Sequence, residues 1–129
     1  MWLELQHVSV PIPPSGRDAA RAFYGGLLGL VERDVPPRLD PSELIWFRVG
    51  EERELHLFSS EETPPVSQHL CLRLSGSSGG EGLVELRERL EAAGVEVEDT
   101  DEIVGRPRFM CRDPFGNRIE LTEWEAGAS

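Results

Sequence analysis

The amino-acid sequence predicts an α+β fold made of two βαβββ modules. Short runs that alternate between apolar and polar residues are typical of half-buried strands, and such runs recur at matching places in both halves of the chain. Each half also has one segment with apolar residues at helical spacing after its first alternating run. His56 follows His7 by 49 residues and Glu120 follows His69 by 51, which indicates an internal duplication.

The first half reads as a strand, a helix and three further strands. The run LQHVSVPI (5–12) alternates and is rich in β-formers, so it predicts the first strand. The segment PSGRDAARAFYGGLLG (14–29) predicts a helix that opens with Ser15 and Asp18 in capping-box spacing and ends at a glycine. Three short β-like runs follow, at residues 30–35, 44–50 and 53–59.

The second half repeats this order. The run QHLCLRL (68–74) alternates like the first strand. The next four apolar positions at helical spacing, which precede a glycine, are Leu83, Leu86, Leu90 and Ala93. Three strands are then expected at residues 95–99, 108–112 and 118–124. We therefore expect one domain with module one at 1–60, a polar linker at 61–67 and module two at 68–125.

Glu120 lies on the strand that leaves a predicted type I turn, Asp113–Gly116, which has proline second and glycine fourth. Alternation places Glu120 on the same face as Arg118 and Thr122, and the apolar Ile119 and Leu121 on the other. A carboxylate on such a polar face usually just contacts water. The same alternation applies to the three histidines of the chain.

His7, His56, His69 and Glu120 all fall on the first or last strand of a module, opposite the apolar residues that a helix would cover. Three imidazoles and one carboxylate suit a divalent first-row metal such as zinc, nickel, iron or manganese. The lack of thiolate pairs and carboxylate clusters disfavours copper(I) and calcium. A single strand histidine is more often a solvent-facing residue than a ligand, but four residues at equivalent positions favour a shared site.

Composition limits the partners and the compartment. A net charge of −11 argues against nucleic acid or an anionic membrane surface, because both would repel the chain. No apolar run approaches membrane-spanning length, and Met1–Glu4 lacks the start of a signal peptide, so a cytoplasmic location is expected. Cys71 and Cys111 have no C-x-x-C spacing and are expected to be small buried apolar residues.

With these residues placed, the segments AFYGGLLGL, EAAGVEV and DPFGNRIEL resemble the vicinal oxygen chelate superfamily over nearly the whole chain. This superfamily includes glyoxalase I, fosfomycin-resistance thiol transferases, extradiol dioxygenases and bleomycin-binding proteins. The resemblance implies two βαβββ modules that form a cup around one metal, with ligands from the first and last strand of each module. The matching positions here are His7, His56, His69 and Glu120.

The ligand set departs from parts of this superfamily. Glyoxalase I typically has glutamate as the last ligand of both modules, whereas the first module here has His56. Fosfomycin-resistance enzymes and extradiol dioxygenases use two histidines and one glutamate, which His7, His69 and Glu120 would supply. Bleomycin-binding members generally lack the metal ligands, so that class is disfavoured.

The leading hypothesis is a glyoxalase-like lyase or isomerase that acts on a small substrate with two adjacent oxygens. The alternatives are an iron-dependent extradiol-type dioxygenase and a non-enzymatic protein that binds an antibiotic or metabolite. Glu120 is the candidate catalytic residue, as ligand and proton carrier. The arginines Arg73, Arg108 and Arg112 are candidates for orienting an anionic substrate, and Trp46 and Phe58 for walling the pocket. A homodimer is expected, because open sheet edges favour pairing.

Overall fold

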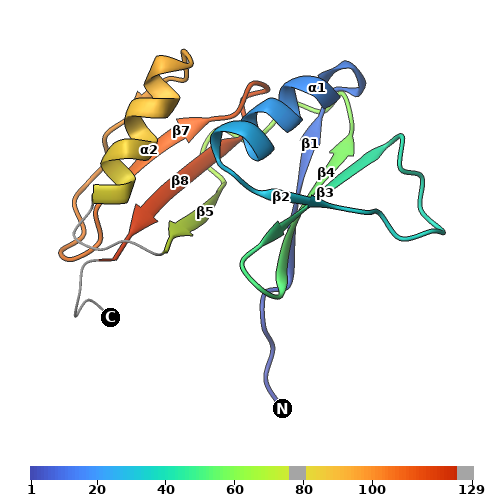
Figure 1. Cartoon of the computed structure of the whole chain (residues 1–129), viewed down its shortest axis with the longest axis horizontal. Coiled ribbons are helices and arrows are strands. Elements are labelled where there is room, and N and C mark those ends of the chain that lie inside the picture. Colours follow the sequence, from blue (N-terminus) through green and yellow to red (C-terminus); the bar gives the residue numbers. More distant parts are fainter. Residues whose placement is uncertain (76–80, 125–129) are drawn as a thin grey trace. The chain divides into compact units, whose positions relative to one another are not determined.

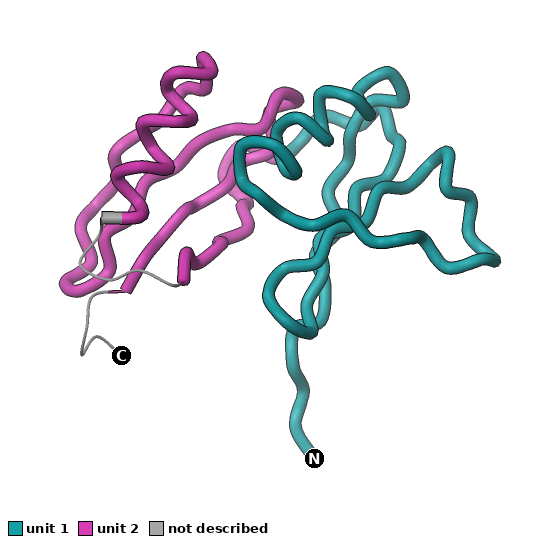
Figure 2. Tube along the Cα trace, viewed as in Figure 1, with its two compact units in different colours: residues 1–64 teal, residues 65–129 magenta. Residues whose placement is uncertain are grey.

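The computed structural model describes residues 1–75 and 81–124, which form two compact units, Met1–Pro64 and Pro65–Ser129 (Figure 2). Their boundary falls within the polar segment expected to link two modules. Residue 125, where module two is expected to end, lies outside the described residues. None of the helices in the described part of the chain is long and apolar enough to cross a membrane.

Each unit contains one four-stranded sheet, and the two sheets have the same topology (Figure 1). The strands of unit 1 are β1 His7–Ile12, β2 Val31–Arg33, β3 Leu44–Val49 and β4 Arg53–Ser59. Unit 2 contains β5 His69–Leu74, α2 Glu81–Ala92, β6 Val97–Glu98, β7 Arg108–Arg112 and β8 Arg118–Glu123. The strand orders are β1-β4-β3-β2 and β5-β8-β7-β6, and the first and last strand of each unit pair in parallel. The predicted α+β fold with two βαβββ modules is confirmed.

The register of the strands is also the same in both units. His7 lies opposite Glu54 and Ser9 opposite His56 in unit 1. In unit 2, His69 lies opposite Arg118 and Cys71 opposite Glu120. In each unit the candidate ligand on the last strand therefore lies two residues beyond the position that faces the first-strand histidine. Equal register in both sheets is what a duplicated module produces.

The helix of unit 1 differs from the single capped helix expected at residues 14–29. It consists of a 3-10 turn, η1 Pro14–Gly16, an α-helical turn, α1 Arg17–Ala20, and a π-helical segment, η2 Arg21–Leu27. The expected capping box at Ser15 is wrong, because Ser15 lies inside the 3-10 turn that Pro14 begins, and no side chain caps it. The helix does end at a glycine, Gly29, whose φ is +74°.

The helix of unit 1 packs on one face of its sheet through aromatic residues. Tyr24 is fully buried, and its ring centroid lies 6.0 Å from that of Phe47 on β3. A Cβ at Gly25 would lie 3.6 Å from the Phe47 ring, which is an ordinary van der Waals distance, so the helix packs closely on β3 at this point. Phe47 pairs with Leu55 on β4, and both are buried. The helix therefore covers the face that carries Phe47 and Leu55.

In unit 2, α2 packs on β8 and β6 and covers one face of the sheet. The helical spacing predicted from sequence is confirmed for Leu83, Leu86 and Leu90, which are all buried. It is wrong for Ala93, which is exposed and lies in the turn after α2 ends at Ala92. The buried Glu123 on β8 accepts a hydrogen bond of 2.8 Å from the backbone N–H of Leu83 in the first turn of α2. This bond satisfies one of the free donors at the helix start and fixes α2 to the strand that carries Glu120.

Each sheet keeps a second face that its own helix does not cover, which we call the open face. Alternation places His7, His56, His69 and Glu120 on these open faces, as predicted. Cys111 is buried as expected, but the expectation for Cys71 is wrong, because Cys71 is exposed. It shares the open face of β5 with His69, whereas Leu70 and Leu72 point to the helix side.

Candidate metal site

In unit 1, three rings from three neighbouring strands stack on one another. The His56 ring lies 3.7 Å from Trp46 with 3° between their planes, and 4.1 Å from His7 with 20° between the planes. Trp46 is on β3 and His7 on β1, and both strands flank β4. His56 is thus held between the other two rings, and it is buried whereas His7 is exposed.

Glu54 fixes the orientation of His56. The Nε2 of His56 donates to Glu54 Oε1 at 3.1 Å, and Arg33 donates to Glu54 Oε2 at 2.6 Å. Burial by itself would raise the pKa of Glu54, but the hydrogen bonds from His56, Arg33 and Gln6 lower that pKa to about 2. Burial lowers the pKa of His56, against the opposing effect of Glu54, which favours the neutral ring. The neutral ring then has its lone pair on Nδ1.

His7 is oriented through its other ring nitrogen. Its Nδ1 lies 2.8 Å from Gln6 Oε1, an acceptor, while the amide nitrogen of Gln6 donates to Glu52 O and Glu54 Oε1. Nδ1 therefore carries the proton, and the Nε2 lone pair of His7 is left for another partner. An acceptor that fixes the tautomer in this way is typical of metal-ligating histidines.

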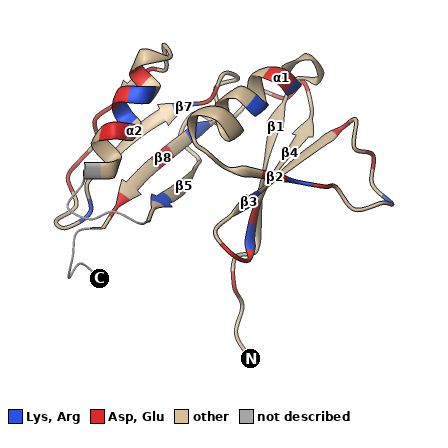
Figure 3. Cartoon of the chain, in the orientation of Figure 1, with Lys and Arg blue, Asp and Glu red and all other residues tan. Residues whose placement is uncertain are grey.

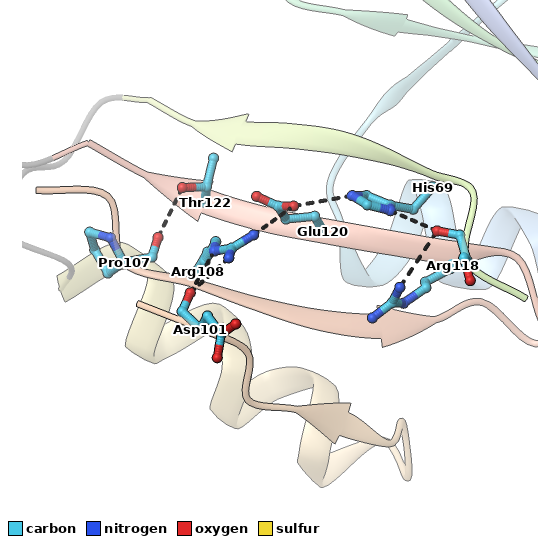
Figure 4. Close-up of polar contacts among 8 residues, drawn as sticks. His69, Asp101, Pro107, Arg108, Arg118, Glu120 and Thr122 are labelled. Carbon is cyan, nitrogen blue, oxygen red and sulfur yellow. Dashed lines mark hydrogen bonds and ion pairs between the residues drawn. The ribbon is translucent and has the colours of Figure 1, made fainter. Parts of the chain in front are cut away.

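In unit 2, His69 and Glu120 meet directly across β5 and β8 (Figure 4). The Nε2 of His69 lies 3.2 Å from Glu120 Oε1, and Nδ1 lies 3.0 Å from the backbone carbonyl of Ser67. Both ring nitrogens thus face acceptors. A neutral imidazole has only one N–H, so it can donate to one of these two acceptors and presents a lone pair to the other.

Arg108 on β7 approaches the same carboxylate from the other side. Its NH1 lies 3.3 Å from Glu120 Oε1, and its remaining donors bind the backbone carbonyl of Asp101 at 3.1 and 2.7 Å (Figure 4). Glu120 is buried, so the contacts with His69 and Arg108 also compensate the cost of burying its charge. The three side chains hold one another in a fixed arrangement.

The donor set fits a divalent metal, but the described residues form pairs rather than one complete cluster. No group of three or more His, Cys, Asp and Glu side chains in the ranges 1–75 and 81–124 is arranged to hold an ion. The stacked rings of His7 and His56 present their in-plane lone pairs side by side, so they do not converge on one ion in this arrangement. His69 and Glu120 do converge, with 3.2 Å between Nε2 and Oε1.

The other predicted site residues lie in several environments. Trp46 lines a pocket of about 190 Å³ in unit 1, and its Nε1 is buried without a hydrogen-bond acceptor among the described side chains and backbone. Phe58 lies opposite Leu44 and Pro11 on the open face of unit 1. Arg73 stacks over Trp124, with 4.4 Å between its guanidinium carbon and the ring centroid.

Arg112 binds two backbone carbonyls, those of Gly116 at 2.9 Å and Val66 at 3.0 Å. Sequence reasoning assigned no role to Arg118, which lies directly opposite both His69 and Arg112. The signal was present in the sequence, because strand alternation places Arg118 on the same face as Glu120. Arg112 was already a candidate from the sequence, but its position directly opposite Arg118 depends on the register of β7 against β8.

Known proteins share both the sequence pattern and the fold. The model of the Glyoxalase/Bleomycin resistance protein/Dioxygenase superfamily matches residues 5–121. A glyoxalase family protein from Bacillus anthracis is 30% identical, with a TM-score of 0.83 over 97% of this chain and 98% of its own. A lactoylglutathione lyase from Agrobacterium tumefaciens is 25% identical, with a TM-score of 0.69 over 93% of this chain and 92% of its own.

TnmS3, an antibiotic binding protein from Streptomyces sp. CB03234, is 24% identical, with a TM-score of 0.71 over 96% of this chain and 98% of its own, and it shows similarity of fold alone. No curated protein matches the chain. The family model covers most of the sequence, and the two modules have the βαβββ order of elements that the sequence predicted. The chain therefore belongs to the Glyoxalase/Bleomycin resistance protein/Dioxygenase superfamily.

Proposed function

We propose that the protein is a metal-dependent, glyoxalase-like lyase or isomerase that acts on a small substrate with two adjacent oxygen atoms. The observation that carries this proposal is the His69–Glu120 pair, in which an imidazole faces a carboxylate across 3.2 Å. The similarity to the lactoylglutathione lyase from Agrobacterium tumefaciens, which has the same fold at 25% identity, supports a reaction of this type.

In this proposal His7, His56, His69 and Glu120 are the ligands of one divalent ion: zinc, nickel, iron or manganese. The bound ion would supply a Lewis acid that stabilises negative charge on a substrate oxygen. Gln6, Glu54 and Ser67 O hold one nitrogen of each histidine, as the partners of metal-binding histidines do. His56 would bind through Nδ1 after a change of ring orientation, because its Nε2 donates to Glu54.

Glu120 is the candidate proton carrier. Its Oε1 accepts from Arg108 at 3.3 Å, which holds the carboxylate at the centre of the open face of unit 2. A carboxylate in this place can take a proton from a carbon next to a substrate oxygen and return it to the neighbouring carbon. The substrate would be a small molecule, oriented by Arg73 and Arg112 and walled by Trp46 and Phe58.

An extradiol-type dioxygenase is the second candidate, and the environment of His56 favours it. His56 is held between two rings and bonded to Glu54, so it is the least available of the four residues. Without it, His7, His69 and Glu120 form a set of two histidines and one carboxylate, which is typical of non-haem iron(II) oxygenases. Oxygen uptake with catechols as substrates would favour this reaction, and formation of S-lactoylglutathione from methylglyoxal and glutathione without oxygen uptake would favour the lyase.

The test of the proposal combines metal content with the variants Glu120→Gln and His69→Ala. We expect about one divalent ion per chain, weaker binding in both variants, and a rate about 10²–10⁴-fold lower in metal-saturated Glu120→Gln, because an amide is no acid or base near neutral pH. Glu98→Gln, which removes an exposed carboxylate from β6, is the control and should bind metal normally.

Elemental analysis that finds no metal, and no uptake of zinc, nickel, manganese or iron(II), would contradict both enzyme hypotheses. The third hypothesis, a protein that binds an antibiotic or metabolite without chemistry, would then be the better one. Unchanged turnover in metal-saturated Glu120→Gln would exclude Glu120 as the proton carrier but leave it as a ligand.

A further inference from the structure

The open face of unit 2 is a regular grid of nine side chains from three adjacent strands. Residues that lie opposite one another in a sheet point to the same side, so the register defines the grid. Each row has one residue from β5, one from β8 and one from β7, in that order. The first row is His69, Arg118 and Arg112, and the second is Cys71, Glu120 and Met110. The third row is Arg73, Thr122 and Arg108. Glu120 occupies the centre, and an arginine occupies four of the other eight positions.

Positive charge on this grid exceeds negative charge, although the whole chain has a net charge of −11. The grid contains four guanidinium groups and a single carboxylate, and the carboxylate contacts Arg108. Blue segments on β5 and β8 mark part of this charge in Figure 3. Within the described residues, the other three arginines contact backbone carbonyls or an aromatic ring.

Arg112 and Arg118 are the closest pair of these charges in the sheet, because they lie directly opposite each other on β7 and β8. Like charges in directly opposite positions destabilise a sheet unless a counter-charge lies between them. Arg112 is held by two carbonyls, those of Gly116 and Val66, and Arg118 has a long contact of 3.5 Å with Ser67 O. These neutral partners position the guanidinium groups, and no carboxylate in residues 1–75 and 81–124 forms an ion pair with either of them.

The pair is also connected to the candidate metal site. The carbonyl of Ser67 that Arg118 contacts is the one that accepts from Nδ1 of His69 (Figure 4). A ligand bound to Arg118 and Arg112 would therefore lie beside His69, in the same row of the grid.

The duplicated fold does not itself require these arginines. At the positions equivalent to Arg118 and Arg112, unit 1 has Glu54 and Arg48, which carry opposite charges. At the positions equivalent to Arg73 and Arg108, unit 1 has Pro11 and Leu44. The two open faces thus have the same geometry but differ in charge, and the cationic character belongs to unit 2 alone.

We propose that Arg112 and Arg118 bind an anionic group of the substrate, a carboxylate or a phosphate, beside the His69–Glu120 pair. The inference rests on the proposed function, since it names the substrate class of that same site. Two adjacent guanidinium groups present several N–H donors in planar forks, which match the oxygens of either anion. Arg73, in the far row of the same face, increases the local positive potential.

The experiment is a titration of metal-free protein, treated with a chelator, at low ionic strength. The probes are lactate, inorganic phosphate and lactamide, the neutral analogue of lactate, and the readout is the NMR signals of the arginine Nε–H groups. We expect saturable shifts at Arg112 and Arg118 with an anion and none with lactamide. The Arg118→Gln variant should bind that anion about tenfold or more weakly, since a hydrogen bond to a charged group contributes this much.

Arg53→Gln is the matched control, because Arg53 is an exposed arginine on the face of β4 that its own helix covers, away from the open face. Equal weakening in this variant, equal binding of lactamide, or unchanged binding in Arg118→Gln would each overturn the proposal. Arg118→Lys keeps the charge and is expected to bind with intermediate affinity, which separates anion binding from a folding defect. Binding of lactate alone identifies a carboxylate, and binding of phosphate alone identifies a phosphate.

Because metal is absent from the titration, the outcome is independent of metal binding. A protein that takes up metal but binds neither anion would overturn this inference and leave the proposed function. A protein that binds anions at Arg118 but takes up no metal would overturn the proposed function and leave the anion site.

Discussion

At the scale of single residues, the two cysteines show how one position in a strand decides chemical behaviour. Cys71 is exposed on the open face of β5, whereas Cys111 is 2% exposed and lies on the helix-facing side of β7. Burial, with a smaller effect of Asp113, raises the pKa of the Cys111 thiol to about 12. The thiolate is the reactive form, so both its formation and its access to reagents are suppressed at Cys111.

We therefore predict that the folded protein presents one reactive thiol. Burial and the neighbouring Glu120 raise the pKa of the Cys71 thiol as well, to about 11, so exposure is the main difference between the two cysteines. At pH 8 a disulfide reagent should modify Cys71 slowly, while Cys111 reacts only after unfolding. The variant Cys71→Ser should consume no reagent in its folded state, and Cys111→Ser should react like the parent. Rapid modification of both thiols in folded protein would contradict the burial of Cys111.

The raised pKa of Cys111 also has a consequence for stability at high pH. A thiol whose pKa is higher in the folded state contributes stability that is fully present below the unfolded value of 9.0 and is lost as pH rises toward 12. The free energy of unfolding should fall less over this range in Cys111→Ala than in the parent. Chemical denaturation at several pH values measures this difference.

At the scale of secondary-structure elements, α2 is fixed to its sheet by apolar contacts along one side. Leu90 is fully buried, whereas Val84 on the same helix is 58% exposed. Glu123 also holds the N-terminal end of α2, because it accepts a hydrogen bond from the backbone N–H of Leu83 in the first turn. Helices of this length depend on packing more than on intrinsic propensity.

Substitution of these two residues should therefore have very different effects. We predict that Leu90→Ala lowers the free energy of unfolding by about 2–5 kcal/mol, because it leaves a cavity between α2 and the sheet. The matched variant Val84→Ala should change it by about 0.5 kcal/mol or less, since that side chain is mostly in water. Denaturant unfolding monitored by circular dichroism measures both values, and a similar loss in both variants would contradict this packing.

At the scale of the whole molecule, the edge strands of the two sheets and the exposed apolar residues before β1 favour self-association. β1 and β2 are the edges of one sheet, and β5 and β6 are the edges of the other. Edge strands offer unpaired backbone groups to another chain. The segment before β1 adds apolar surface, because Trp2, Leu3 and Leu5 are 79%, 96% and 67% exposed.

We predict a homodimer that pairs through this N-terminal segment and β1. Light scattering should give twice the chain mass of 14.4 kDa, and Leu3→Asp should shift the protein toward the monomer. Val104→Asp is the control, because Val104 is 92% exposed in unit 2 and the change adds the same charge. A mass of 14.4 kDa across a wide concentration range would contradict the dimer.

The sequence by itself determined the two βαβββ modules, their eight strands and the face on which each candidate ligand lies. Strand alternation and helical spacing are local properties, so nearby residues are enough to reveal them. The helix of unit 1 is an exception, because the 3-10 and π segments at its ends depend on Pro14 and on how Phe23 and Tyr24 pack.

Tertiary structure decided how the site residues meet one another. That His56 stacks between Trp46 and His7 depends on side-chain torsions and on strands far apart in sequence. That Arg118 lies opposite Arg112 depends on the register of β7 against β8. Alternation assigns a residue to a face, but only the pairing of strands determines which charges become neighbours on that face, because register is set by contacts across the whole sheet.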